Sequence, residues 1–106
     1  MSMSKKITII DYGTSNLRSV TKAFIKVDAD IIITNDHKEI ENADKLVLPG
    51  VGSFGNGMHM LDELNIIDSI NLFVKKGNPF LGICLGMQML LDGSEEDNSK
   101  KGLKLI

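Results

Sequence analysis

The chain contains little cysteine, little proline and few aromatic residues. Its 106 residues include one cysteine, two prolines and no tryptophan. A single cysteine cannot form a disulfide within the chain, so nothing in the composition indicates an exported, disulfide-stabilised protein. We therefore expect a cytoplasmic protein, because a reducing compartment keeps a working thiol free.

Long apolar runs and runs of one charge are also missing. No stretch approaches the roughly eighteen apolar residues of a membrane helix, and the first residues do not have the pattern of a signal peptide. The 12 basic and 14 acidic residues give a formal net charge of −2. Without a basic run, neither nucleic acid nor a membrane surface is an expected partner.

Segments with strand character alternate with segments of helical periodicity. Strands are predicted at 7–10, 30–34, 45–48, 79–83 and 103–106, and helices at 15–27, 38–42, 58–76 and 85–91. This order predicts a mostly parallel sheet with helices on both faces, a three-layer, flavodoxin-like α/β sandwich. Because the last predicted strand has no turn or polar tail after it, the sequence looks truncated.

The single cysteine, Cys84, lies in the frame Gly82-Ile83-Cys84-Leu85-Gly86, between a predicted strand and a predicted helix. In a G-x-nucleophile-x-G turn, the glycines remove side chains that would collide as the backbone reverses, so the nucleophile is exposed. The free N–H groups of the following helix favour a thiolate. A buried, apolar cysteine is the alternative, but the spacing favours a nucleophile.

A second glycine-rich segment, residues 48–57, follows the third predicted strand. It lacks the lysine of a Walker loop, and its match to G-x-G-x-x-G is weak because it does not follow the first strand. The carboxyl ends of parallel strands open at one edge, so this segment and the Cys84 turn should share a crevice. N–H groups near Val51 and Gly52, with that of Leu85, would then form an oxyanion hole. Glycines in a plain tight turn are the alternative.

Three motifs taken together resemble a known family. They are Asp11-Tyr12-Gly13 with Asn16-Leu17-Arg18-Ser19-Val20, then Leu48-Pro49-Gly50-Val51-Gly52, and Leu81-Gly82-Ile83-Cys84-Leu85-Gly86-Met87-Gln88. They resemble the glutaminase subunits of imidazole glycerol phosphate synthases, which are class I glutamine amidotransferases of histidine biosynthesis. The resemblance runs from about Ile7 to Ile106. It implies that residues 1–106 are the N-terminal part of a single amidotransferase domain.

The resemblance also implies a reaction. Cys84 would attack the side-chain amide of L-glutamine, giving a glutamyl thioester and ammonia, and water would then release glutamate. The amides near Val51 and of Leu85 would hold the oxyanion, while Gly50 and Gln88 would bind the substrate. No cofactor and no metal ion are implied.

A partner is implied as well. The loop that carries Asp11, Tyr12, Gly13 and Asn16 would face a (β/α)₈-barrel synthase subunit that receives the ammonia. Thr14-Ser15 stands in this loop where the family more often has Met-Gly.

The histidines do not supply an obvious catalytic base. The family takes its base from a His-x-Glu pair far beyond the nucleophile turn, and the sequence given ends at Ile106. We interpret His37 as a solvated loop residue, His59 as a helix-surface residue, and Asp11 as ordering its own loop. We therefore expect these 106 residues alone not to hydrolyse glutamine appreciably.

Three alternatives remain open at this stage. The first is a paralogous amidotransferase that supplies ammonia for sugar amidation in surface polysaccharide pathways. The second is a truncated, non-catalytic module that binds the barrel partner, and the third is a flavodoxin-like nucleotide binder. Self-association of the chain through residues 103–106 is also expected, because a strand cut within a sheet leaves unpaired backbone groups.

Overall fold

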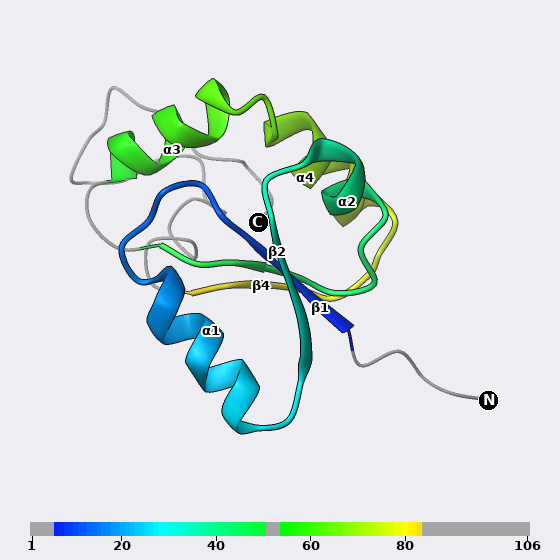
Figure 1. The fold of residues 1–106 in the computed structure, drawn as a ribbon. Helices are drawn as coiled ribbons and strands as arrows, with labels where there is room; N and C mark the ends of the chain where they lie inside the picture. The colour runs from blue at the N-terminus through cyan, green and yellow to red at the C-terminus, as the bar shows by residue number, and fades with distance from the viewer. Residues whose placement is uncertain (1–5, 51–53, 84–106) are drawn as a thin grey trace.

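A computed structural model describes residues 6–50 and 54–83 of the chain, and Figure 1 shows their arrangement. Within them one parallel sheet has the strand order β2-β1-β3-β4. The strands are β1 (Lys6–Ile10), β2 (Asp30–Thr34), β3 (Leu46–Leu48) and β4 (Phe80–Gly82). The helices are α1 (Leu17–Lys26), α2 (His37–Glu41), α3 (Phe54–Glu63) and α4 (Ile67–Lys75). The predicted parallel α/β fold is confirmed.

The side chains of the central strands point alternately to the two faces of the sheet, and they contribute to a separate core on each face. Ile10 of β1 and Leu48 of β3 lie in the larger core, whereas Ile9 and Val47 lie in the smaller one. Neighbouring residues separate in this way because successive side chains of a strand point to opposite faces. The register pairs Ile9 with Val47, so the smaller core continues across the two central strands.

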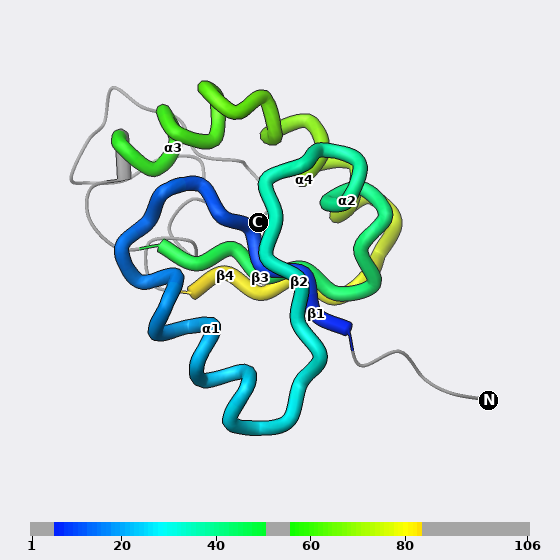
Figure 2. The backbone as a smooth tube through the Cα atoms, in the orientation of Figure 1, coloured from blue at the N-terminus to red at the C-terminus, as the bar shows by residue number. Residues whose placement is uncertain are grey.

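Helices cover both faces of the sheet, as a parallel sheet requires. Figures 1 and 2 show α1 on one side, and α2, α3 and α4 on the other. The larger core contains Ile40 of α2, Leu61 of α3, and Phe73 of α4, all fully buried. The smaller core contains Val20 of α1. The described residues therefore form three layers.

The prediction of one helix over residues 58–76 is wrong. The structure has two helices, α3 and α4, and Asn65 between them has a φ of 57°. The Ile66 N–H donates to the Leu61 carbonyl at 3.3 Å, and the Asn65 N–H donates to the Asp62 carbonyl at 3.0 Å. These two bonds around a left-handed residue form the Schellman motif, which ends a helix. The break lets Ile66 enter the core, where it is fully buried.

Strand β2 has its predicted bounds, and the other described elements differ from their predicted ranges by one or two residues at an end. Helix α2 begins at His37, so this residue is the first of a helix and not part of a loop. The helix predicted at 85–91 and the strand predicted at 103–106 lie outside the described residues.

Candidate functional site

The carboxyl ends of three neighbouring strands bring the predicted site segments to one edge of the sheet. Strand β3 lies between β1 and β4, and all three strands are parallel. The N–H of Ile83 donates to the carbonyl of Leu48 at 3.0 Å, which continues the β3–β4 pairing to the last described residue. The two glycine-rich segments therefore leave adjacent strands at the same edge.

Most residues predicted to take part in the chemistry are not among those described. Gly50 is described, and it is buried directly after β3 and Pro49. The remaining members of the predicted set lie outside the described residues: Cys84, Val51, Gly52, Leu85 and Gln88. Their roles stay predictions, as does the predicted strained turn at Cys84.

The loop after β1 is organised by its own side chains. The Gly13 N–H donates to Oδ1 of Asp11 at 3.2 Å, which confirms that Asp11 orders its loop. Gly13 has a φ of 91°, a conformation that other residues rarely adopt. Further along, the Thr14 hydroxyl donates to Oδ1 of Asn16 at 3.0 Å. The loop thus holds a defined shape between β1 and α1.

This loop contacts the backbone of the second glycine-rich segment. The Tyr12 hydroxyl donates to the Pro49 carbonyl, and Nδ2 of Asn16 donates to the Gly50 carbonyl at 3.4 Å. Tyr12 is 2% exposed. Burial raises the pKa of Tyr12 to about 12, and a hydrogen bond with the Thr14 side chain partly offsets this rise. Two successive carbonyls are therefore held by one loop.

The contacts of Tyr12 and Asn16 with the second glycine-rich segment were not anticipated from the sequence, which suggested a partner-facing role for the loop and a loop-ordering role for Asp11. That role stays a prediction for Asp11, Tyr12, Gly13 and Asn16, although the Tyr12 side chain is already buried within the chain. The sequence contains one relevant signal: Tyr12 stands two residues after a buried strand, and an aromatic residue with a hydroxyl needs a polar partner when it packs inside. It does not reveal which partner.

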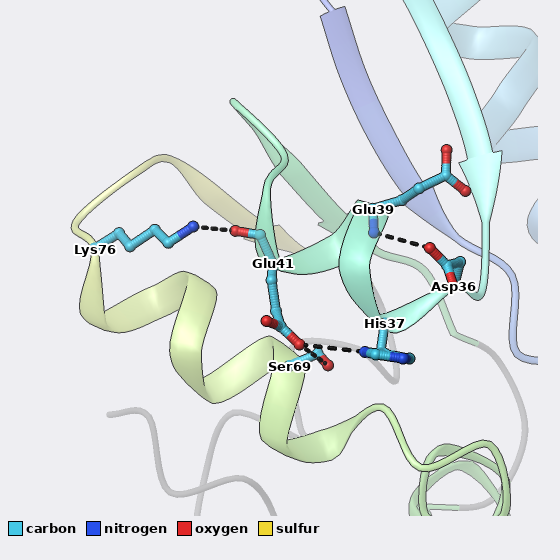
Figure 3. A network of polar contacts seen from close by, with 6 residues as sticks. All are labelled: Asp36, His37, Glu39, Glu41, Ser69 and Lys76. Atoms are coloured by element: carbon cyan, nitrogen blue, oxygen red, sulfur yellow. Dashed lines mark hydrogen bonds and ion pairs between the residues drawn. The ribbon is translucent and has the colours of Figure 1, made fainter.

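Neither described histidine bonds to a residue of the candidate site. In Figure 3, Glu41 joins α2 to α4: its Oε2 accepts from the Ser69 hydroxyl at 2.9 Å and lies 3.5 Å from Nδ1 of His37. The Lys76 ammonium also donates to the Glu41 carbonyl. His59 is an exposed residue of α3 whose Nε2 lies 3.4 Å from Oε1 of Glu63, as expected for a helix-surface histidine.

An apolar hollow of about 440 Å³ lies between α1 and the end of β4. Asn16 and Ile83 contribute to its wall, together with Ser19, Val20, Ala23, Phe24 and Val27. A free amino acid carries two charges that need polar partners, and none of the described residues in this wall has a charged side chain. The described part of this wall therefore offers no partner for either charge of a free glutamine.

No group of three histidine, cysteine, aspartate or glutamate residues in 6–50 and 54–83 could hold a metal ion. No helix in this part of the chain combines the length and apolar character that a membrane span needs.

Comparison with known proteins identifies the family. Residues 8–102 match the family model described as glutamine amidotransferase class-I. The chain belongs to the class I glutamine amidotransferase family. The fold agrees: a solved structure of a peptidase E protein from Listeria monocytogenes EGD-e superposes with a TM-score of 0.72 over 98% of this chain and 64% of that one, at 12% identity.

The sequence is similar to one particular group within this family. It is 51% identical over 100 residues to imidazole glycerol phosphate synthase subunit HisH 1 of Legionella pneumophila strain Paris, covering 94% of this chain and 47% of the relative. It is 46% identical over 102 residues to subunit HisH of Aquifex aeolicus, covering 95% and 49%. The chain thus spans about half the length of the relatives it matches.

Proposed function

We propose that residues 1–106 are the N-terminal part of one class I glutamine amidotransferase domain, the glutaminase of an imidazole glycerol phosphate synthase. The observation that carries this proposal is the 46% to 51% identity over nearly the whole chain to proteins of that name. The domain would hydrolyse L-glutamine and pass ammonia to a (β/α)₈-barrel subunit of histidine biosynthesis, in the cytoplasm. The adjacent exits of β3 and β4 are compatible with this proposal.

The proposed reaction has two halves. The Cys84 thiolate attacks the side-chain carbonyl carbon of glutamine, and the carbonyl oxygen becomes an oxyanion that the N–H groups of Val51 and Leu85 hold. The C–N bond then breaks, the nitrogen leaves with a proton as ammonia, and a glutamyl thioester remains. Water adds to the thioester, the C–S bond breaks, and glutamate and the thiolate are released. Gly50 and Gln88 would orient the glutamine.

A proton carrier is needed in both halves, because the leaving nitrogen takes up a proton and the attacking water gives one up. His37 lies beside Glu41 on α2 and His59 beside Glu63 on α3, and neither histidine bonds to a described residue of the candidate site. We propose that the base is the histidine of a His-x-Glu pair beyond residue 106. A positioned base contributes about 10²- to 10⁴-fold to a step of this kind.

The test compares glutamate release by residues 1–106 with release by a longer gene product that continues past Ile106. Each is assayed with and without the barrel subunit, beside a Cys84→Ala variant. We expect turnover by the longer product with the barrel subunit, none by its Cys84→Ala variant, and none above background by residues 1–106. A longer product that releases no glutamate would overturn the proposed function, and Cys84-dependent turnover by residues 1–106 would show that a base lies within them.

A second candidate function follows from the length of the match, which covers 47% to 49% of the relatives. The chain would be a non-catalytic module that binds the barrel subunit. Binding in a pull-down without turnover by any longer product would support this candidate. A different experiment addresses the paralogous amidotransferase for sugar amidation in surface polysaccharide pathways. Rescue of a histidine auxotroph by the longer gene would support histidine biosynthesis over that alternative.

A further inference from the structure

We propose that Tyr12 is a positioning residue for the substrate: its hydroxyl fixes the direction of the Gly50 N–H, and this N–H binds the α-carboxylate of glutamine. The inference rests on the proposed function, because it deepens the role that Gly50 has there. It starts from the hydrogen bond that the Tyr12 hydroxyl donates to the carbonyl of Pro49, a contact between residues 37 positions apart.

The carbonyl of Pro49 and the N–H of Gly50 belong to the same peptide unit. Such a unit is planar and almost always trans, so its C=O and N–H point in opposite directions. The proline ring fixes φ of Pro49, which leaves rotation about ψ as the main freedom of this unit. A hydrogen bond to the carbonyl restricts that rotation and therefore sets the direction of the N–H.

The carbonyls on either side are held as well. The Ile83 N–H donates to the Leu48 carbonyl at 3.0 Å, and Nδ2 of Asn16 donates to the Gly50 carbonyl at 3.4 Å. Three successive carbonyls, at residues 48, 49 and 50, thus accept hydrogen bonds from the end of β4 or from the loop after β1. Glycine by itself permits wide backbone rotation, so these bonds give residue 50 a defined conformation.

Burial makes the Tyr12 contact difficult for water to replace. Tyr12 is 2% exposed, and Pro49 is among the fully buried residues. The ring packs in the larger core with Ile10 and Leu48, so the hydroxyl has a fixed position. Without the hydroxyl, a buried carbonyl would lose its partner, and the peptide unit that contains the Gly50 N–H would lose its restraint.

The polar groups of Gly50 determine what it can offer to glutamine. A glycine has only a backbone C=O and N–H, and the carbonyl of Gly50 already accepts from Asn16. The α-carboxylate of glutamine is an acceptor only, so it needs donors such as this N–H. Hydrogen bonds to a charged acceptor are stronger than those to a neutral one, so the direction of the donor matters most here.

The decisive variant is Tyr12→Phe, tested in the longer gene product with saturating barrel subunit. Phenylalanine keeps the ring in the core and removes the donor. We expect KM for L-glutamine to rise about 5- to 10-fold, because a hydrogen bond to a charged acceptor contributes about 10- to 100-fold and a redirected donor loses part of it. We expect kcat to change less than about twofold, since the carboxylate is bound equally before and during the reaction.

A second substitution separates the hydrogen bond from the shape of the side chain. In Tyr12→p-aminophenylalanine an amino group replaces the hydroxyl and can still donate to the carbonyl of Pro49. This variant should have a KM within about twofold of the unsubstituted protein, because the donor is kept.

Ser69→Ala is the matched control for stability. It also removes a buried hydroxyl that donates to a partner, Glu41, but at the junction of α2 and α4. Both Ser69→Ala and Tyr12→Phe should lower the thermal midpoint, because each leaves a polar group without its partner. Only Tyr12→Phe should raise KM.

The outcomes are distinguishable. If the unsubstituted protein releases glutamate and Tyr12→Phe keeps its KM, the positioning role is overturned while the proposed function stands. A lower kcat at unchanged KM would show that the Gly50 N–H does not serve the carboxylate. An equal rise in KM for Ser69→Ala or for the p-aminophenylalanine variant would make Tyr12 a structural residue only. If the unsubstituted protein releases no glutamate, the proposed function and this inference are both overturned.

Discussion

At the scale of single residues, Tyr12 shows how one side chain serves two structural needs. Its ring packs in the larger core with Ile10 and Leu48, and its hydroxyl reaches the carbonyl of Pro49. A buried hydroxyl without a partner would lose the hydrogen bonds that water provides, so this contact removes a desolvation cost. Tyr12 consequently ties the loop after β1 to the segment after β3.

Tyr12 should titrate far above the ordinary range, and its ionisation should destabilise the fold. Its pKa is about 12 in the folded chain, against 10.0 for an unperturbed tyrosine. Because the unfolded chain loses this proton first, the contribution to stability is complete below pH 10 and is lost as the pH rises through about 12. Tyr12 is the only tyrosine, so tyrosinate absorbance measures it directly.

The matched control for this titration is Tyr12→Phe, which keeps the ring and removes the hydroxyl. We expect the variant to show no tyrosinate signal and a shallower fall in unfolding free energy between pH 10 and pH 12. An absorbance midpoint near pH 10 would show that the hydroxyl is solvated and does not hold the Pro49 carbonyl.

At the scale of elements, the break between α3 and α4 depends on one residue. Asn65 has a φ of 57°, and asparagine is among the few residues besides glycine that adopt this conformation readily. The break changes the direction of the chain, so that Leu61 before it and Ile66 after it both enter the larger core. A continuous helix would have kept its regular 3.6-residue spacing through residues 64–66, without this change of direction.

We expect Asn65→Ala to lower the free energy of unfolding by about 1 kcal/mol, because alanine lacks the short polar side chain that lets asparagine adopt the left-handed conformation more readily than other residues with a β-carbon. Asn65→Gly should change it by less than about 0.5 kcal/mol, since glycine adopts this conformation freely. Urea denaturation followed by circular dichroism measures both variants. Equal destabilisation by alanine and glycine would mean that the asparagine side chain, not the backbone conformation, stabilises the break.

Helix α2 is too short to be stable alone, and contacts at its two ends stabilise it. It has five residues, and isolated helices of this length do not persist in water. The Asp36 side chain accepts from the Glu39 N–H at 3.1 Å and caps the helix. At the other end, Glu41 binds Ser69 of α4. The helix is held by its cap and by the neighbouring helix.

At the scale of the whole molecule, the two faces of the sheet are covered unequally in the described residues. Three helices cover one face, and α1 alone covers the other (Figure 1). Leu81 of β4 is 50% exposed and borders a hollow of about 180 Å³ with Phe24 and Val47. Strand β4 also forms one edge of the described sheet.

We expect purified residues 1–106 to self-associate through this face, because exposed apolar surface beside a strand edge favours pairing of copies. Leu81→Ser should weaken the association about 5- to 10-fold, in line with the loss of part of one leucine's burial. Leu72 is 48% exposed on α4, on the opposite side, so Leu72→Ser is the matched control and should leave the association unchanged.

Sedimentation velocity over a range of concentrations measures this association. A monodisperse monomer at every concentration would contradict the prediction. If Leu81→Ser and Leu72→Ser weaken the association equally, the copies associate through another surface. The segment 103–106, predicted from the sequence, is one such surface.

The sequence by itself determined the kinds of elements and the class of fold. Short apolar runs such as 30–34, separated by helical periodicity, are sufficient for a parallel α/β sheet, because both patterns arise from the local geometry of strands and helices. Three motifs, at 11–20, 48–52 and 81–88, together indicated the family, which the match over residues 8–102 shows. All of these signals are local in the chain.

Only the tertiary structure decided which distant segments meet. The order β2-β1-β3-β4 places the loop after β1 beside the segment after β3, and from this adjacency follow the bonds from Tyr12 to Pro49 and from Asn16 to Gly50. The structure likewise showed what the helix end at Asn65 achieves, since a local pattern does not reveal that Ile66 after the break is buried in the core. Periodicity describes one segment at a time, whereas these contacts depend on how whole strands are ordered in space.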